Sequence, residues 1–544
     1  MTWPSIRNFL QIPHHLTGKG VGIAVVDGRF PNHPDIAATS RRNTYLVKTS
    51  EPDPVPSLMT ADDGPWTRGR HGLAAAAAAA GSGLISQGLY TGSAPDADLY
   101  LLETGRLNTD QDVECKIAAA LDWLYLNWRR YRIRGVVVTI AATRDTGLLP
   151  WQADPIRIGC EKLAADGLLV VAATGNTQEL TSNGPASSPS VLSVGGVIVP
   201  EDADIRYAKP YYGCRGTTFE GKWVPEIVAP AKNIVLPAPF VSLEERQSHF
   251  TARFDNLPEG YARTEGTSFA APIVLGCAAC LWQAQPSWTA GQVKAAIVES
   301  SAVVGQWTEL HAGLVDVKAA IHADTSVEES DPPYTLWCSW KEKDSFERLK
   351  AIKAQEETSI ASAALLSYCD APIFPETQEQ VLFLTGSRSG RVRAAAITAL
   401  AFYQEALSIQ DYCRILHDDS RFVRMAALFA LSRSPGLHHQ LKDEVAGLFS
   451  DSDLDIRYCA IKLAGNIRDE AFVKPLLSGI EDDAIHERVS IFAARCSALV
   501  AITGIQFEPE PRWLEEQGIY SERSTCGRVH IARKWRQWAS YLSP

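Results

Sequence analysis

The first 325 residues alternate short, uninterrupted apolar runs with longer alanine-rich stretches. Four runs, bounded by glycine, proline or polar residues, have the pattern of strands buried on both faces: Val21–Val26, Leu99–Leu102, Val136–Ile140 and Leu168–Ala172. Helices are expected between them, at Leu73–Ala80, Val113–Trp128 and Ile156–Ala165. This alternation predicts an α/β domain over residues 1–325, with a doubly wound parallel sheet and helices on both faces.

The pattern changes after residue 325. A polar, acidic, proline-bearing stretch predicts a linker over 326–340. Beyond it, apolar residues that open alanine-rich helices recur at spacings of 32, 31, 33 and 33 residues. A fixed period of this length predicts a helical solenoid, in which each repeat buries its apolar face against its neighbours. The recurring residues are Ile360, Val392, Val423, Ile456 and Val489, and arginine follows three of them, at Arg393, Arg424 and Arg457.

These repeats resemble short HEAT-like repeats, through the segments VRAAAITAL, VRMAALFAL and IRYCAIKLA. We therefore expect an all-α HEAT-like solenoid over residues 341–510 that presents an extended surface to a protein partner. Residues 511–544 are expected to cap it, because apolar residues recur at helical spacing within Arg528–Leu542. An amphipathic helix on a membrane surface is the alternative for that segment.

The amino-acid composition makes some classes of protein function less plausible than others. With 46% hydrophobic and 21% charged residues in 544, the chain is typical of a globular protein of two or three domains. A net charge of −11 argues against a nucleic-acid binder held by non-specific charge. The first twenty residues lack a secretory signal pattern, and no apolar stretch reaches the ~20 residues of a membrane span. The eleven cysteines are an odd number with irregular spacing, so we expect reduced thiols and a cytoplasmic protein without a membrane span.

Two candidate catalytic residues lie in the first 80 residues. Asp27 stands at the carboxyl end of a predicted strand, where sites form in open α/β sheets. An aspartate that caps a turn is the alternative. His71 heads a helix that consists almost entirely of alanine, so this helix is expected to pack centrally. A solvated or capping histidine is the alternative.

Two more candidates follow later in the chain. Asn176 ends the segment GLLVVAATGN, in which a predicted strand runs into a Gly-Asn turn. Ser268 lies in EGTSFAAPIVLG, at the start of a predicted helix with Pro272 in its first turn. Free N–H groups and the helix dipole favour an oxyanion at such a position. A turn asparagine and an N-cap serine are the alternatives.

The order Asp27, His71, Asn176, Ser268, with these flanks, resembles the subtilisin family of serine peptidases. GTSFAAP is close to the serine signature of the family, and HG followed by small residues fits its histidine signature. The resemblance covers residues 18–323. It implies a subtilisin-like fold and an Asp27–His71–Ser268 triad with Asn176 in the oxyanion hole. It also implies a protein or peptide substrate and no required cofactor, although family members often bind structural calcium. The sequence does not identify calcium ligands.

Several positions depart from the family pattern. Gly28 follows the aspartate where the family usually carries Ser or Thr, and Leu73 follows HG in place of Thr or Ser. Thr174 replaces a small residue before the oxyanion asparagine. The substrate-pocket edge, usually Ser-Leu-Gly, is expected at Ala141, Ala142 and Thr143, and Gly175 is a further substrate-binding candidate. None of these changes removes a catalytic group, but they affect the expected substrate preference.

The sequence therefore predicts an intracellular serine endopeptidase whose repeat domain binds a substrate or a regulatory partner. A catalytically silent or partner-activated binding protein on a peptidase scaffold is one alternative. Transfer of the acyl group to an amine, as in a peptide ligase or cyclase, is the other. Hydrolysis and acyl transfer share their first half-reaction, so the sequence does not separate them.

Overall fold

The computed structural model divides into two compact units. Unit 1 comprises Met1–Gly147 and Asp154–Tyr334, and unit 2 comprises Leu148–Ala153 and Thr335–Pro544. The structure describes residues 3–541 apart from 65, 67–68, 107–109, 142–146, 183, 239–256, 304–306, 308, 326–330, 355–357, 370–374, 404–406, 487 and 508–524.

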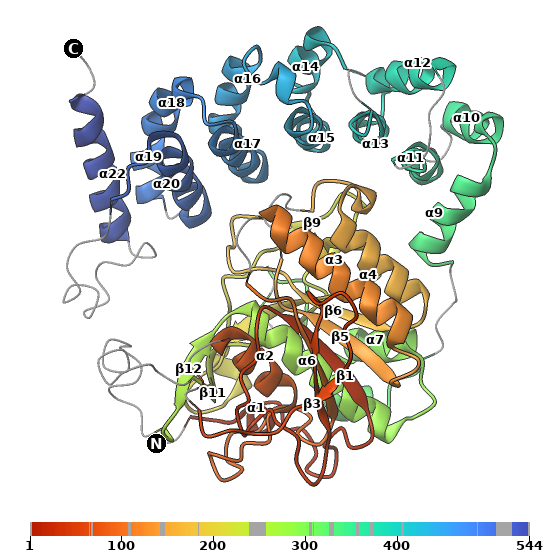
Figure 1. The fold of residues 1–544 in the computed structure, drawn as a ribbon, viewed down its shortest axis with the longest axis vertical. Coiled ribbons are helices and arrows are strands. Elements are labelled where there is room, and N and C mark those ends of the chain that lie inside the picture. Colours follow the sequence, from red (N-terminus) through yellow and green to blue (C-terminus); the bar gives the residue numbers. More distant parts are fainter. Residues whose placement is uncertain are drawn as a thin grey trace. The chain divides into compact units, whose positions relative to one another are not determined.

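Unit 1 is built on a mainly parallel sheet (Figure 1). Its strand order is β12-β11-β7-β6-β5-β1-β4-β2-β3. The neighbours from β11 to β2 are parallel, whereas β12, β3 and the short β8 pair in the antiparallel sense. The strands are β1 (Gly22–Asp27), β2 (Thr44–Lys48), β3 (Ser57–Leu58), β4 (Asp98–Glu103), β5 (Ile133–Val138), β6 (Leu169–Ala173), β7 (Leu192–Ile198), β8 (Lys209–Pro210), β11 (Ile227–Pro237) and β12 (Tyr261–Glu265).

Helices cover both faces of this sheet, as the sequence pattern predicts. In β1, Ile23 and Val25 face one apolar cluster, which also contains side chains of α2 (Arg70–Ala80), α6 (Thr267–Ala284) and α7 (Ala290–Glu299). Ala24 and Val26 face the other cluster, with side chains of α3 (Asp110–Asn127) and α4 (Pro155–Ala165). The four predicted strands and three predicted helices are confirmed as β1, β4, β5, β6, α2, α3 and α4, with ends shifted by a few residues.

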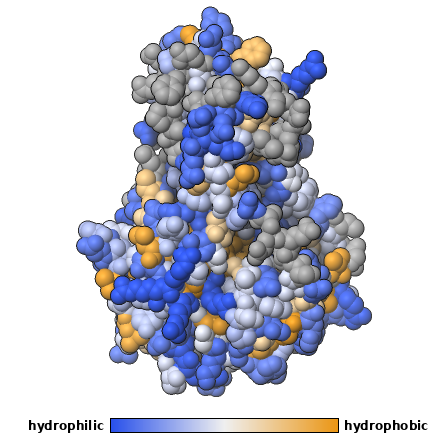
Figure 2. All heavy atoms as spheres, turned by 90° about the vertical axis from the view of Figure 1, so that its right-hand side faces the viewer, coloured by the Kyte–Doolittle hydropathy of each residue, from blue (hydrophilic) through white to orange (hydrophobic). Residues whose placement is uncertain are grey.

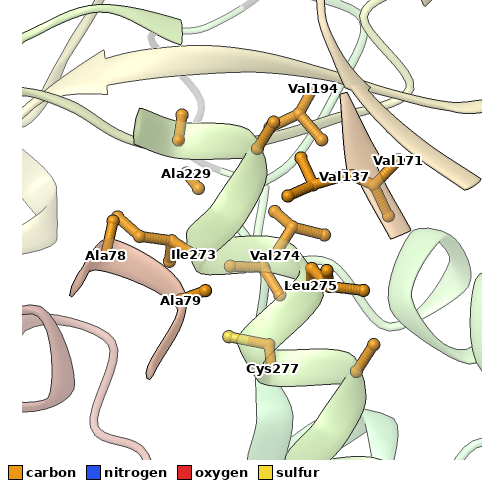
Figure 3. Close-up of a cluster of buried hydrophobic side chains, with 14 of the residues drawn as sticks. Ala78, Ala79, Val137, Val171, Val194, Ala229, Ile273, Val274, Leu275 and Cys277 are labelled. Carbon is orange, nitrogen blue, oxygen red and sulfur yellow. The ribbon is translucent and has the colours of Figure 1, made fainter. Parts of the chain in front are cut away.

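Helix α6 forms the centre of the first cluster (Figure 3). Its side chains from Ile273 to Leu275 lie between alanines of α2 and valines of β5, β6 and β7. The two helices approach closely, since a Cβ on Gly276 would stand 2.5 Å from the carbonyl oxygen of Ala79. Among the described helices, only α6 is long and apolar enough to cross a membrane, and 83% of the residues tested are buried within the protein. Its composition is therefore explained by its place in the core.

One local prediction is wrong. Pro272 is the sixth residue of α6 and not part of its first turn, because the helix begins at Thr267, directly after Gly266. Proline has no N–H, so the carbonyl of Ser268 receives no helical hydrogen bond from position 272.

Unit 2 contains the recurring helices that the period predicts. Each apolar marker lies in one of the helices α11, α13, α15, α17 and α20, and successive members of this row pack together (Figure 1). Helix α9 (Pro333–Glu342) occupies the second half of the expected linker, so residues 333–340 are helical. The other helices of the unit are α10 (Ser345–Ala354), α11 (Thr358–Leu366), α12 (Pro375–Phe383), α13 (Gly390–Leu400), α14 (Ile409–Ile415), α15 (Arg421–Ser432), α16 (Lys442–Gly447), α17 (Leu454–Ile467), α18 (Val473–Ser478), α19 (Ile480–Ile485), α20 (Val489–Thr503) and α22 (Thr525–Ser540).

The repeated arginines make equivalent contacts. Arg424 forms a two-pronged ion pair with Asp451, with nitrogen–oxygen distances of 2.8 and 2.9 Å. Arg393 pairs with Asp418 in the same two-pronged way, and Arg457 pairs with Asp483 through one contact of 3.3 Å. Each arginine thus ties its helix to an aspartate of the following repeat. The closer resemblance to HEAT-like repeats stays a prediction.

The two ends of unit 2 are held by particular contacts. The ring of Trp151, from the short segment Leu148–Ala153, lies 5.2 Å from that of Trp337 in α9. At the other end α22 packs on α19, where Arg528 donates to the carbonyl of Ala484 and Arg536 pairs with Glu481. Figure 2 shows a face on which polar side chains dominate and hydrophobic side chains are scattered. Scattered hydrophobic side chains are ordinary on a protein surface and do not indicate a binding partner.

Candidate active site

The carboxylate of Asp27 and the imidazole of His71 form a direct pair. Asp27 is the last residue of β1 and is almost fully buried. His71 is the second residue of α2, and its Nδ1 lies 2.7 Å from Oδ2 of Asp27. The next residue is Gly72, where a Cβ would stand 2.2 Å from the carbonyl oxygen of Arg29. The absence of a side chain there lets the first turn of α2 approach the loop after β1.

Two further groups hold the Asp27 carboxylate. The backbone N–H of Gly28 donates to Oδ1 at 2.7 Å. The hydroxyl of Thr139 has one proton and lies near two acceptors, Oδ2 of Asp27 at 2.6 Å and the carbonyl oxygen of Val26 at 2.9 Å, of which the nearer, charged carboxylate is the stronger. Burial by itself would lower the pKa of His71, but the neighbouring Asp27 outweighs burial and raises it above the ordinary value of 6.5. The imidazole is therefore a stronger base than one in water.

Ser268 and Asn176 line one cavity of about 190 Å³. Ser268 is the second residue of α6, which follows the left-handed Gly266 with φ of 144°. The ring of Phe269 lies 5.4 Å from the ring of His71. This contact brings the start of α6 beside the Asp27–His71 pair, so all four predicted residues lie in one region of unit 1.

Asn176 is oriented by the turn that begins α6. The backbone N–H of Thr267 donates to the side-chain oxygen of Asn176 at 2.8 Å, and the Thr267 hydroxyl lies 3.1 Å from the same oxygen. Because these donors engage the amide oxygen, the amide nitrogen is the end of the side chain that remains to donate elsewhere. This is the arrangement that an oxyanion donor needs.

The cavity walls are mostly small and uncharged. Ala141 and Gly175, expected at the substrate pocket, line the cavity with Ser268. Ala142 and Thr143, expected beside them, lie outside the described residues. Thr139 and Pro185 were not identified from the sequence, although Thr139 lies near the end of the predicted strand Val136–Ile140. The cavity is lined by Val138, Thr139, Ile140, Ala141, Ala173, Gly175, Asn176, Pro185, Thr267 and Ser268.

A structural calcium site has no matching side-chain cluster in the described part of the chain. No three histidine, cysteine, aspartate or glutamate side chains gather there in a way that could hold a metal ion. The described residues therefore do not fit a carboxylate-built metal site.

Comparison with known proteins finds similarity between unit 1 and several serine proteases. The chain is 27% identical over 290 residues to serine protease AprX of Bacillus subtilis (strain 168), which is 51% of this chain and 60% of AprX. It is 27% identical over 307 residues to subtilisin BL of Lederbergia lenta, covering 56% of this chain and 92% of that protein. The solved prenylagaramide maturation protease PagA aligns with 57% of this chain and 97% of its own, at 22% identity and a TM-score of 0.41.

The match to AprX thus spans three fifths of that relative's length. The Subtilase family model matches residues 18–328, which is more than half of the chain and nearly all of unit 1. This match over more than half of the chain shows that the chain belongs to the Subtilase family.

Proposed function

We propose that unit 1 is a serine endopeptidase that hydrolyses peptide bonds through an acyl-enzyme. The observation that carries the proposal is the 2.7 Å contact of His71 with Asp27, beside a cavity that holds Ser268 and Asn176. In the proposed mechanism Ser268 is the nucleophile, His71 is the general base and then the general acid, and Asp27 orients the imidazole.

The chemistry runs in two halves. The Oγ atom of Ser268 forms a bond to the substrate carbonyl carbon while its proton passes to Nε2 of His71. The tetrahedral oxyanion accepts hydrogen bonds from the side-chain amide of Asn176 and the backbone N–H of Ser268. His71 returns the proton to the leaving amine as the peptide C–N bond breaks. Water then attacks the acyl-enzyme by the same route and releases the acid.

The start of α6 favours this charge development. Ser268 lies in the first turn of an 18-residue helix, where backbone N–H groups lack helical partners and the dipole is positive. An oxyanion that forms beside Ser268 is stabilised by both.

The cavity favours an uncharged substrate side chain. Its described lining contains the uncharged polar residues Thr139, Asn176, Thr267 and Ser268 beside alanine, glycine, proline and branched apolar residues, and no charged one. A lysine or glutamate side chain buried there would lose its hydration without gaining a partner of opposite charge among the described lining residues. We expect kcat/KM to be at least roughly 10-fold higher for peptides with alanine or leucine before the cleaved bond than for matched peptides with lysine or glutamate.

Unit 2 is proposed to bind a protein substrate or a regulatory partner. The support is the row of five recurring helices, since stacked helical repeats present extended binding surfaces. Deletion of residues 330–544 is expected to change the rate or the substrate choice on folded proteins while short peptides are still cleaved. Unchanged activity and unchanged substrate choice would contradict a role for this unit.

The decisive test is labelling of the full chain with a fluorophosphonate probe, which reacts with an activated serine. We expect labelling of the wild type, none of Ser268→Ala, and strongly slowed labelling of His71→Ala. A folded wild type that is not labelled would favour the silent or partner-activated scaffold. Product masses in the presence of added amines separate hydrolysis from acyl transfer.

A further inference from the structure

The ammonium group of Lys222 lies inside a cage of oxygen atoms. Lys222 sits in the turn between β9 (Gly216–Thr217) and β10 (Trp223–Val224), and its side chain is only 10% exposed. Its Nζ donates to the backbone carbonyls of Ala186, at 3.2 Å, and Ser188, at 2.9 Å. It also contacts the carbonyl of Val191, and a carboxylate oxygen of Glu226 lies 2.9 Å away.

This cage has more oxygen atoms than the ammonium has protons. Lysine offers three N–H donors, whereas four oxygens surround Nζ within 3.2 Å. Three of the oxygens are carbonyls of one short loop, residues 186–191, that converge on one point. Convergent carbonyls with one carboxylate are the ligand set that proteins use for hard cations such as Ca²⁺.

The surroundings of the cage balance its charge. The second carboxylate oxygen of Glu226 lies 3.0 Å from Nζ of Lys294, which also donates to the carbonyls of Ser190 and Val191. Burial would raise the pKa of Glu226, but Lys222 and Lys294 outweigh burial and lower it to about 2. Burial lowers the pKa of Lys222 to about 8, against the opposing effect of Glu226, so the ammonium is mostly charged at neutral pH.

The loop around the cage continues into the cavity wall at the candidate active site. Ala186 belongs to the same single 3₁₀ turn as Pro185, which lines the cavity with Ser268. The backbone N–H of Ser188 donates to the carbonyl of Pro185 at 3.1 Å. An interaction that holds the carbonyls of Ala186 and Ser188 therefore also fixes the position of Pro185.

We propose that Lys222 is a positioning residue whose ammonium serves as a built-in cation for this loop and so fixes Pro185 in the wall of the substrate cavity. A metal ion does not fit the cage while Lys222 occupies it, because the two positive charges would share the same four oxygens. Removal of the lysine side chain leaves three carbonyls and a carboxylate around an open position, which is a site for Ca²⁺ or Na⁺.

The test compares Lys222→Ala and Lys222→Met in the full chain. Alanine empties the cage, whereas methionine fills it with an uncharged side chain. We expect both variants to lose roughly 6–12 °C in the Tm of unit 1, because each leaves Glu226 without its nearest cation. Added CaCl2 or NaCl, at an ionic strength held constant with choline chloride, is expected to raise the Tm of Lys222→Ala and not that of Lys222→Met. The matched control is Lys294→Ala, which also removes a cation from Glu226 but leaves the cage filled and gains no cation response.

Peptide hydrolysis supplies the second readout, and this part alone rests on the proposed function. KM of Lys222→Ala is expected to rise roughly 10-fold with a smaller change in kcat, and the same cation should restore KM. If Lys222→Ala is insoluble, refolding with and without CaCl2 or NaCl replaces the melting curve. A Tm or refolding yield of Lys222→Ala that responds to cations no more than the wild type and Lys294→Ala do would overturn the proposal. Absence of peptidase activity in the wild type would instead overturn only the proposed function.

Discussion

The hydroxyl of Thr139 lies 2.6 Å from the carboxylate oxygen of Asp27 that also contacts His71. The two residues are 112 positions apart and meet because β5 runs parallel to β1, so that both strands end at the same edge of the sheet. Gly28, where subtilisin-like sequences usually carry Ser or Thr, offers Asp27 only its backbone N–H. Thr139 therefore provides a side-chain donor to this carboxylate from the neighbouring strand.

Replacement of Thr139 by valine is expected to lower kcat/KM by roughly 10-fold, mainly through kcat. A hydrogen bond to a charged group contributes about 1.5 kcal/mol or more, and here it holds the group that orients the general base. Steady-state kinetics on a peptide substrate measure the effect. Thr139→Ser keeps the hydroxyl and is expected to retain most of the activity. Equal losses in both variants would show that packing at β5, and not the hydrogen bond, matters.

The activity is expected to fall on the acidic side with a midpoint above pH 6.5. His71 must be neutral to accept the proton of Ser268, and Asp27 raises the pKa of His71, so the imidazole stays protonated to a higher pH than in a free peptide. The measurement is the pH profile of kcat/KM, or of the fluorophosphonate labelling rate, between pH 5 and pH 9. An acid-side midpoint below 6.5 would contradict the contact between Asp27 and His71 in the working enzyme.

Replacement of Asn176 by aspartate tests the role of the amide nitrogen separately from that of the amide oxygen. Aspartate keeps an oxygen for the N–H of Thr267 but has no amide hydrogen to donate, and it places a negative charge near the oxyanion. We expect kcat to fall by about 10²-fold or more with little change in KM. Asn176→Ala, which removes both ends, is the matched control. Near wild-type turnover by the aspartate variant would exclude the side chain as an oxyanion donor.

The sequence predicts the parallel core of the sheet because each strand there is apolar along its whole length and can be recognised without its neighbours. The run at Val136 is apolar on both faces, and such a run is visible without knowledge of its neighbours. The later strands are harder to find. In β11, Pro230 and Lys232 interrupt the apolar run, and the register with β7 shifts at that point. A pattern of local hydrophobicity does not identify such a strand.

The candidate site was predictable where short motifs mark it and not where it depends on contacts across the fold. Asp27, His71, Asn176 and Ser268 each stand in a recognisable segment. Thr139 and Lys222 do not, because a threonine at a strand end and a lysine in a turn are commonplace. Their roles arise from the sheet register and from the way one loop folds around a charge.

In unit 2, the ion pair between Arg424 and Asp451 joins successive helices. Their side chains are 12% and 6% exposed and share two hydrogen bonds, so Arg424→Ala leaves a carboxylate that is nearly buried and has lost its cation. We expect unit 2 to lose about 3 kcal/mol of its free energy of unfolding. Arg421→Ala is the control, because Arg421 is 33% exposed and lies 3.2 Å from Asp453, so this ion pair should contribute less than about 1 kcal/mol. Denaturant unfolding followed by circular dichroism measures both, while fluorophosphonate labelling reports whether unit 1 stays intact. Similar losses in the two variants would show that the recurring Arg–Asp pairs do not stabilise the repeat contacts.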